Sequence, residues 1–220
     1  MSNLTKKSEF FASLKNAPNL EELTLKRFKY MNVTNLEDCL KDNNGNKYEL
    51  QSVKRLDLSG YSKGSEQNIL SNLKGIEQFT HLENLTMNYT SEILDISAIK
   101  NCTTLKNISL KYCNIQSLNG IETLNNLKTL YLNYNNISNL KPLENLKNLT
   151  SLNLENNTIS DTATYTDTDG SVKAINNINI LANLNKNKNG KLENLYLKGN
   201  DNIVNWSPLS SLTWSVKSGW

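Results

Sequence analysis

Apolar residues recur at a fixed spacing along most of this 220-residue chain. A six-residue segment with an apolar first, fourth and sixth position starts at Leu20, Val53, Leu82, Leu105, Leu127, Leu149 and Leu192. The intervals between these starts are 33, 29, 23, 22, 22 and 43 residues, so the underlying unit has 22 residues and the longer units contain insertions. Alternation within the segment predicts a short β-strand, and repetition at this period predicts a solenoid of stacked coils.

The residues after each strand follow a different period. In the two most regular units, apolar residues fall at every third position, at Ile115, Leu118, Ile121, Leu124 and at Ile137, Leu140, Leu143, Leu146. A spacing of three matches a 3₁₀ turn rather than a 3.6-residue helix, and Pro142 fits such a segment. We therefore expect an α/β solenoid with a curved parallel β-sheet on the concave side and short 3₁₀ turns and loops on the convex side.

Asparagine occupies one position after the strand in the later units, at Asn135, Asn157 and Asn200. A side-chain amide there can donate to and accept from backbone groups of a neighbouring coil. Earlier units have Phe28, Tyr61, Thr90 and Cys113 at this position, so we expect more irregular loops toward the N-terminus.

The cysteines do not form an even set. Cys102 and Cys113 fall at positions where the repeat has buried apolar residues, and both are interpreted as reduced core thiols. The pattern does not place Cys39.

Both ends of the array are predicted to be capped, because a terminal coil otherwise exposes its apolar edge. Trp206 and Trp214 are expected to close the last edge. The predicted domains are an N-terminal helical cap over 1–19, a solenoid of about seven repeats over 20–212 and a C-terminal cap or tail over 213–220.

Two of the insertions have the pattern of β-hairpins. They lie near 39–50 and 161–176, where β-forming residues flank an Asn-Gly or an Asp-Gly pair. A further loop is expected at 185–190.

The charge balance excludes several classes of partner. The chain has 24 Lys and Arg residues against 21 Asp and Glu residues, and a net charge of +3 creates no strong field for nucleic acid or an anionic membrane. No apolar run approaches the length of a membrane span, and the N-terminal segment lacks the apolar stretch of a secretory signal. We expect no nucleic-acid partner and no membrane insertion.

The repeated segments resemble those of leucine-rich repeat proteins. The 22-residue unit and the segment ISNLKPLENLKNLTSLNLENNTISD are similar to bacterial internalin-like surface proteins, and the resemblance covers about residues 20–212. Insertions in the first, second and sixth units depart from the regular array of that family. The resemblance implies recognition of a protein or glycan partner by the concave sheet and does not imply an enzyme.

Residues that alternate with the inward leucines are expected to face the concave side. Three tyrosines from successive units would stand about one strand spacing apart, roughly 4.8 Å, as an aromatic strip at the rim. Tyr and Asn are good contact residues in protein interfaces. The predicted partner-binding residues are Tyr89, Tyr112, Tyr131, Tyr134, Tyr196, Lys111, Asn133, Asn153, Glu155 and Lys198.

The same tyrosines have a purely structural interpretation, in which β-favouring side chains stack on one another for stability. The sequence leaves these two interpretations open. The mixed charge of the face gives no prediction for the charge of the partner.

No catalytic, cofactor-binding or metal site is predicted. His81 is the one histidine, and no zinc motif or nucleotide loop accompanies it. Asp161, Asp167 and Asp169 lack the spacing of a calcium loop, so turn chemistry explains Asp169-Gly170 better. One enzyme-class hypothesis remains, in which the 161–176 hairpin and the 185–190 loop build a catalytic or metal site.

The sequence therefore favours a non-catalytic, monomeric protein-interaction module of a bacterial surface or secreted protein. It would recognise a protein, or a glycan, through its concave sheet. The alternative is a cytosolic leucine-rich repeat scaffold or regulatory subunit. The expected location is the cell surface or outside the cell if the chain is part of a longer exported protein, and the cytoplasm otherwise.

Overall fold

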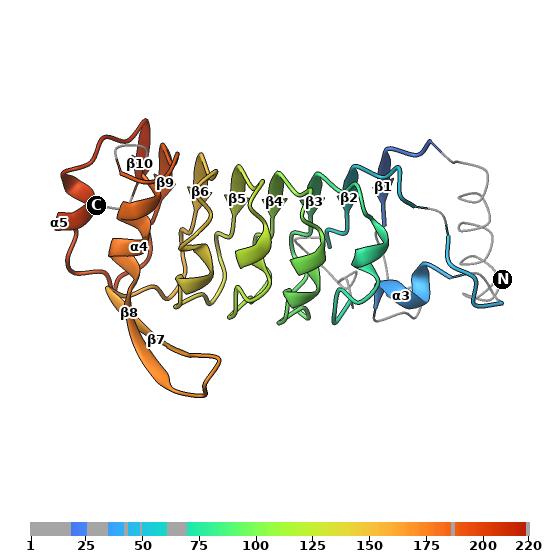
Figure 1. Cartoon of the computed structure of the whole chain (residues 1–220), viewed down its shortest axis with the longest axis horizontal. Coiled ribbons are helices and arrows are strands. Elements are labelled where there is room, and N and C mark those ends of the chain that lie inside the picture. Colours follow the sequence, from blue (N-terminus) through green and yellow to red (C-terminus); the bar gives the residue numbers. More distant parts are fainter. Residues whose placement is uncertain are drawn as a thin grey trace.

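The structure is a computed structural model that describes residues 19–25, 35–41, 44–48, 50–60, 70–185 and 188–218. The coils stack side by side in one elongated array, with the short strands along one side and the turns on the other (Figure 1). The predicted N-terminal cap up to residue 18 lies outside the described residues, as do Phe28, Tyr61 and the side chain of Cys39.

A parallel β-sheet runs through the described array. From the first strand to the strand at Asn194–Tyr196, the middle residue of each three-residue strand is buried, and its two neighbours are exposed or half-buried. Each strand pairs in register with the equivalent residues of the next coil. In sheet order the strands are β1 (Glu22–Thr24), β2 (Arg55–Asp57), β3 (Asn84–Thr86), β4 (Asn107–Ser109), β5 (Thr129–Tyr131), β6 (Ser151–Asn153), β9 (Asn194–Tyr196) and β10 (Val216–Ser218).

Seven of these strands fall within the predicted six-residue segments, which confirms the solenoid prediction. The eighth, β10, lies beyond the predicted end of the array at 212, in the segment 213–220 that was expected to be a cap or tail. The Leu197 N–H donates to the Ser218 carbonyl over 2.8 Å, so the sheet extends one strand further. The leucine pattern is absent from this last strand, and main-chain pairing alone defines it.

Short 3₁₀ turns lie opposite the sheet, as the spacing of three predicts. Pro142 stands in the first turn of one of them, where its missing N–H is not needed. The turns are η1 (Ile76–Gln78), η2 (Ser97–Asn101), η3 (Ile121–Thr123) and η4 (Lys141–Leu143).

In the described part of the chain, three α-helices depart from the expected 3₁₀ pattern: α3 (Leu36–Cys39), α4 (Asn177–Leu184) and α5 (Ser207–Ser210). The expectation of 3₁₀ turns throughout is wrong for the sixth unit, where the insertion leaves room for the eight-residue α4. Its N-terminus is capped by the Asn176 side chain, which accepts from the Asn179 N–H.

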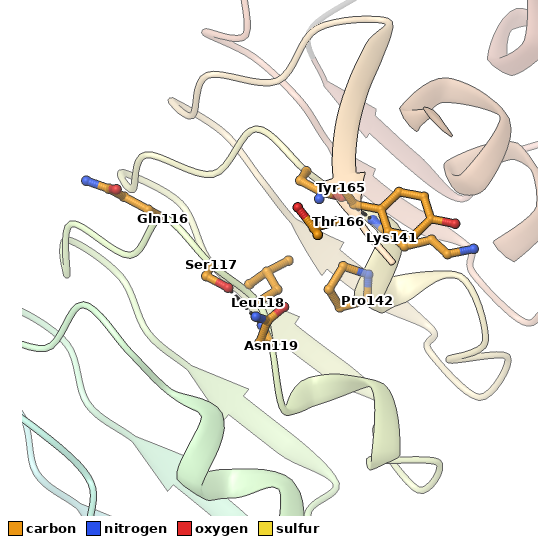
Figure 2. Close-up of a pocket in the computed structure, with 9 residues that line it drawn as sticks. Gln116, Ser117, Leu118, Asn119, Lys141, Pro142, Tyr165 and Thr166 are labelled. Carbon is orange, nitrogen blue, oxygen red and sulfur yellow. Dashed lines mark hydrogen bonds between the residues drawn. The ribbon is translucent and has the colours of Figure 1, made fainter. Parts of the chain in front are cut away.

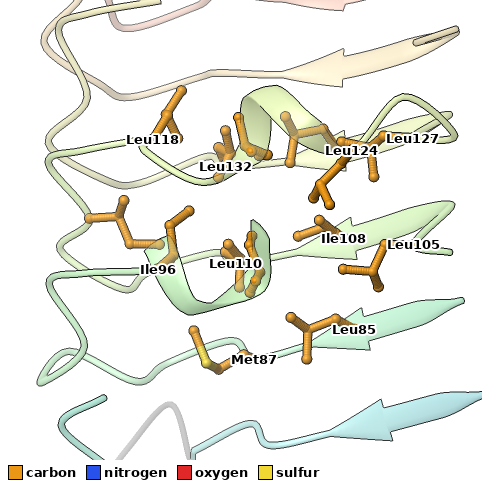
Figure 3. Packing of buried hydrophobic residues seen from close by; sticks show 14 of the residues in the cluster. Leu85, Met87, Ile96, Leu105, Ile108, Leu110, Leu118, Leu124, Leu127 and Leu132 are labelled. Carbon is orange, nitrogen blue, oxygen red and sulfur yellow. The ribbon is translucent and has the colours of Figure 1, made fainter. Parts of the chain in front are cut away.

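The core consists of leucine and isoleucine side chains that point inward from the strands and the turns. Leu85, Ile108 and Leu130 come from the centres of neighbouring strands and are at most 1% exposed. Figure 3 shows side chains of successive coils in the same arrangement, one above the other. Each coil therefore buries its apolar residues against those of its neighbours.

Buried asparagines join the coils behind the sheet, as predicted. The Asn135 amide donates to the carbonyls of Leu110 and Leu132 over 2.7 and 2.8 Å, and its Oδ1 accepts from two N–H groups of the preceding coil. Asn157 and Asn200 donate to the equivalent carbonyls one and two coils later, and the Oδ1 of each accepts from one N–H of the preceding coil. These three residues form the amide ladder, which satisfies backbone groups that no strand can pair.

A hydroxyl and a thiol replace the amide in the preceding coils. The Thr90 hydroxyl donates to the Met87 carbonyl over 3.1 Å, and Cys113 Sγ lies 2.9 Å from the same oxygen. Cys102 and Cys113 are buried and form no disulfide, which confirms the core-thiol interpretation. Burial raises the pKa of the Cys102 thiol to about 11.

A β-hairpin extends from the array between β6 and β9, on the side away from the sheet (Figure 1). Its strands, β7 (Thr162–Thr166) and β8 (Val172–Asn176), pair antiparallel. Near the first insertion, Lys41 and Lys47 form an antiparallel bridge around Gly45, whose φ of 83° requires the freedom of glycine.

Removal of an amide from the ladder should destabilise the fold. In Asn157→Ala, the Ile137 N–H loses its partner inside the protein. The Leu132 and Leu154 carbonyls each lose one of two amide donors and keep the other, from Asn135 and Asn200 respectively. We expect a loss of about 1–3 kcal/mol in the free energy of unfolding by chemical denaturation. Asn136→Ala, at an exposed asparagine of the previous coil, is the control and should change little. Equal effects of the two variants would show that the ladder is not a stabilising element.

Ion pairs connect the N-terminal coils. Glu37 accepts from Lys41 over 2.6 Å and pairs with Lys74 of the next coil over 2.7 Å. Glu21–Lys54, Glu22–Arg55 and Glu83–Lys106 join other pairs of coils. The hydrogen bonds from Lys41 and Lys74 lower the pKa of Glu37 to about 2.

These ion pairs predict that the fold becomes less stable in acid. The folded-state pKa of Glu37 lies below its ordinary value of 4.5. Its ion pairs therefore contribute to the stability of the fold above that pH, and this contribution disappears as the pH falls to about 2. Denaturation midpoints measured at constant ionic strength should fall over this window, and less steeply for Glu37→Gln. The exposed Glu92→Gln is the matched control. A Glu37→Gln curve parallel to that of the wild type would contradict the assignment.

Candidate functional site

The predicted binding residues occupy the ends of neighbouring strands and the loops directly after them. Tyr131, Asn153 and Tyr196 end β5, β6 and β9 and stand next to one another in the sheet register. Lys111, Asn133, Glu155 and Lys198 each follow two residues after a strand. The structure thus brings these seven residues together on four adjacent coils.

Tyr89, Tyr112 and Tyr134 form a stack, here called the tyrosine ladder. The ring centroids of Tyr89 and Tyr112 are 4.8 Å apart with planes 12° from parallel, and those of Tyr112 and Tyr134 are 4.2 Å apart at 10°. This confirms the spacing expected from the sheet. The three residues are 37, 39 and 44% exposed, so part of each remains open to solvent along one rim of the sheet.

The backbone of the tyrosine ladder is left-handed. Tyr89, Tyr112 and Tyr134 have φ values of 58°, 57° and 61°, whereas the next two coils use Asn156 and Gly199 at the same position. Asn and Gly tolerate this region well, and a bulky residue there is an outlier. The conformation is imposed by pairing, because the Tyr89 N–H donates to the Lys111 carbonyl over 2.9 Å and the later ladder residues repeat this bond.

Strain in the tyrosine ladder exceeds the gain from stacking. A left-handed non-glycine residue costs about 1–2 kcal/mol, and a stacked aromatic pair contributes about 0.5–1.5 kcal/mol beyond its buried area. Three strained residues therefore cost about 3–6 kcal/mol, against about 1–3 kcal/mol from two stacked pairs. Fold stability alone gives no strong reason for tyrosine at these three positions.

Burial among the neighbouring rings, and then the hydrogen bond with Tyr134, raise the pKa of the Tyr112 phenol. The hydroxyl therefore stays protonated well above neutral pH. Protonated phenols on the rim can both donate and accept hydrogen bonds.

Lys111 is held over the face of the sheet. Its Nζ lies 4.9 Å from the centroid of the Tyr131 ring, which is a cation–π contact. Its backbone N–H donates to Asn88 Oδ1 over 2.9 Å, and the same oxygen accepts from the Ser109 hydroxyl. Asn88 and Ser109 were not among the predicted residues, although both fall at outward positions of the repeat.

Asn133 differs from the exposed contact residue that its outward position in the repeat predicts. The residue is 9% exposed, and its Oδ1 has no hydrogen-bond partner among the described residues. An unpaired buried acceptor costs about 1–3 kcal/mol. This acceptor lies between the coils of Lys111 and Glu155, in the middle of the candidate surface.

Glu155 is tied to the last strand. Its backbone N–H bonds to Asn153 Oδ1 over 2.9 Å, and its Oε1 accepts from the Ser218 hydroxyl over 3.1 Å. Ser218 belongs to β10 and therefore could not be found from the leucine pattern. The acidic end of the surface is fixed by this contact.

The acidic residues near the hairpin have structural partners. Asp161 accepts from the N–H groups of Val204 and Asn205, Asp167 pairs with Lys173, and Asp169 accepts from Ser171. Among the described residues, no three His, Cys, Asp or Glu side chains are grouped so as to hold a metal ion. His81 is exposed, and its Nδ1 lies 2.8 Å from the Gln51 carbonyl.

Comparison with known proteins gives a consistent result for the fold. Residues 125–166 match the family described as Leucine Rich repeats (2 copies), and no curated protein matches the chain. An internalin structure (InlF) from Listeria monocytogenes superposes with a TM-score of 0.63 at 20% identity, over 94% of this chain and 49% of that one. Internalin C2 (InlC2) from the same species gives a TM-score of 0.62 at 24% identity, over 94% of this chain and 83% of that one.

The chain folds as a leucine-rich repeat solenoid, similar in fold to these internalin structures. It spans about half the length of the first of these internalin structures. Each helix in the described part of the solenoid is too short or too polar to cross a membrane.

The left-handed backbone at the tyrosine ladder predicts that a glycine variant is more stable than an alanine variant, which reverses the usual order of stability. Tyr112→Ala and Tyr112→Gly both lose the stacked ring, but only alanine keeps the strain of a left-handed residue. We expect the glycine variant to be more stable by about 1 kcal/mol in chemical denaturation.

Asn107, in the middle of the sheet, provides the control pair. Asn107→Ala should be the more stable variant there, because glycine weakens a strand. If the alanine variant were the more stable one at both positions, residue 112 would not be strained in solution.

Proposed function

We propose that this solenoid is a non-catalytic protein-interaction module that binds a protein partner through the concave sheet and the tyrosine ladder. The observation that carries the proposal is the left-handed backbone of three successive tyrosines. Strained residues persist at functional sites, and here glycine or asparagine would serve the fold with less strain. Tyrosine adds what these residues lack, which is a large rigid contact surface with a polar tip.

The surroundings of the tyrosine ladder support an interface rather than a stack that serves stability alone. Lys111 and Glu155 place opposite charges on either side of the unpaired Asn133 Oδ1. A partner that donates a hydrogen bond to this oxygen would relieve an unsatisfied buried group. Aromatic residues beside a desolvated polar group have the composition of an interface hot spot.

The setting of the module is also a proposal. Both internalin structures come from Listeria monocytogenes, and their likeness supports a place in a bacterial surface or secreted protein. The alternative is a cytosolic scaffold or regulatory subunit. Fractionation of cells that express the full-length gene separates the two, because a surface protein is accessible to protease added to intact cells and a cytosolic one is not.

We further propose that the solenoid, from residue 20 through β10, acts as a single monomeric unit. The half-buried Trp206 and Trp214 would help to close its C-terminal edge. Trp214 Nε1 donates to the Leu209 carbonyl over 3.0 Å, which supports a structural role for this tryptophan.

The proposed interface is tested by replacing two residues of the tyrosine ladder together. Tyr112→Asn plus Tyr134→Asn removes two rings but keeps a residue that tolerates the left-handed backbone, as Asn156 does in the next coil. The double variant should keep its melting temperature and lose partner capture from host-cell and bacterial extracts. Loss of two hot-spot residues corresponds to at least about tenfold weaker binding.

Lys100→Ala, at an exposed residue of η2 on the opposite side of the coil, is the matched control and should capture the same species as the wild type. Equal capture by the wild type and the tyrosine variant would exclude the tyrosine ladder as the contact. A large fall in melting temperature with unchanged capture would make the ladder structural.

A further inference from the structure

A cleft lies on the side of the solenoid away from the sheet, where the β7–β8 hairpin folds back toward two earlier coils. It has a volume of about 340 Å³, which is within the usual range of small-molecule sites. Figure 2 shows the turn of residues 116–119 on one side and Lys141, Pro142, Tyr165 and Thr166 on the other. Three segments that are distant in the sequence therefore build it, and none belongs to the tyrosine ladder.

The hairpin wall of the cleft is held in place by specific contacts. The Asn139 amide donates to the Thr164 carbonyl over 3.2 Å, and Lys141 Nζ lies 5.2 Å from the centroid of the Tyr165 ring. At the base of the hairpin, the fully buried Asn177 donates to the carbonyls of Ser138 and Ser160. The inserted hairpin is thus fixed against η4, and the cleft is a pre-formed feature.

The lining of the cleft is polar but carries little net charge. Side-chain amides and hydroxyls supply both donors and acceptors, and none of the nine lining residues is acidic. The one cation, Lys141, is already paired with Glu144 over 2.5 Å. Pro142 and Tyr165 add apolar surface between the polar groups.

We propose that this cleft binds a short neutral glycan. Vicinal hydroxyl groups both donate and accept, which matches the amide of Asn119 and the hydroxyls of Ser117 and Thr166. The C–H face of a sugar ring is apolar and fits against Tyr165, next to Pro142. Such a ligand needs no counter-charge, in agreement with a cleft whose lysine is neutralised from within the protein.

Two other ligand classes fit the cleft less well. An anion would have to compete with Glu144 for Lys141, and no second cation lines the cleft. An extended peptide would bind by pairing with the edge of β7, but the Thr164 carbonyl there already accepts from Asn139. The glycan site is independent of the proposed protein interface, since the two lie on opposite sides of the coil.

The test uses the full chain and ligand-observed saturation-transfer NMR with chitotriose, cellotriose and maltotriose. Sodium sulfate and a tetraproline peptide represent the other two classes and are followed by amide chemical shifts. We expect at least one trisaccharide to bind with a millimolar dissociation constant and to shift the amide signals of Asn119 and Tyr165. Asn119→Ala and Tyr165→Ala should each weaken this binding about tenfold.

Val172→Ser, at a residue of the same hairpin that is 71% exposed and does not line the cleft, is the matched control and should bind as the wild type does. All variants are compared by melting temperature, so that loss of binding is not confused with loss of fold. Absence of binding by all three trisaccharides would overturn the proposal. Tighter binding of sulfate or of the peptide, or saccharide binding unchanged in Tyr165→Ala, would also overturn it.

Discussion

Backbone groups that point into the interior must find hydrogen-bond partners, and this requirement governs the structure of each coil. Only three residues of a coil pair as strand, so the bends behind the sheet leave N–H and C=O groups inside the protein. In the later coils the amides of Asn135, Asn157 and Asn200 satisfy them with nearly the same set of bonds. Each amide closes its own coil and joins it to a second one. The spacing of the asparagines therefore also fixes the register of the sheet.

A fixed register has consequences at the rim of the sheet. Once equivalent residues are aligned from coil to coil, a residue repeated in sequence becomes a continuous column in space. Tyr89, Tyr112 and Tyr134 therefore stack, although 22 or 23 residues separate them along the chain. In these three coils and the next two, the residue at this position has a left-handed backbone, whether it is Tyr, Asn or Gly. The solenoid thus supplies both the rigidity of the tyrosine ladder and the strain within it.

The sequence predicts the regular part of this structure well, for a physical reason. Repetition makes the environment of Leu130 nearly the same as that of Leu152, so one interpretation of the pattern applies to many residues. The strands β1 to β6 and β9, the 3₁₀ turns and the amide ladder could all be predicted in this way. The strand β10 could not, because main-chain pairing with β9 defines it and its side chains carry no leucine pattern.

The candidate surface was predictable in position but not in detail. Outward alternation places Lys111, Asn133 and Glu155 on one face, but it does not show that Asn133 is buried with an unpaired oxygen. That depends on how the side chains of three coils pack around it. The left-handed φ of Tyr112 is likewise set by a hydrogen bond to the next coil, to the Asn133 carbonyl, and not by the residue itself.

Insertions allow a repeat protein to acquire a second surface without disturbing the first. The sixth unit holds 21 residues beyond the 22-residue period, and the amide of Asn177 maintains the interior bonds where the chain leaves the array and returns. The extra residues can then fold as a hairpin against η4, where Asn139 and Lys141 meet it. Because the sheet register from β6 to β9 is unchanged, the tyrosine ladder and the cleft under the hairpin can vary independently. A solenoid built this way can present two different binding chemistries on one rigid array.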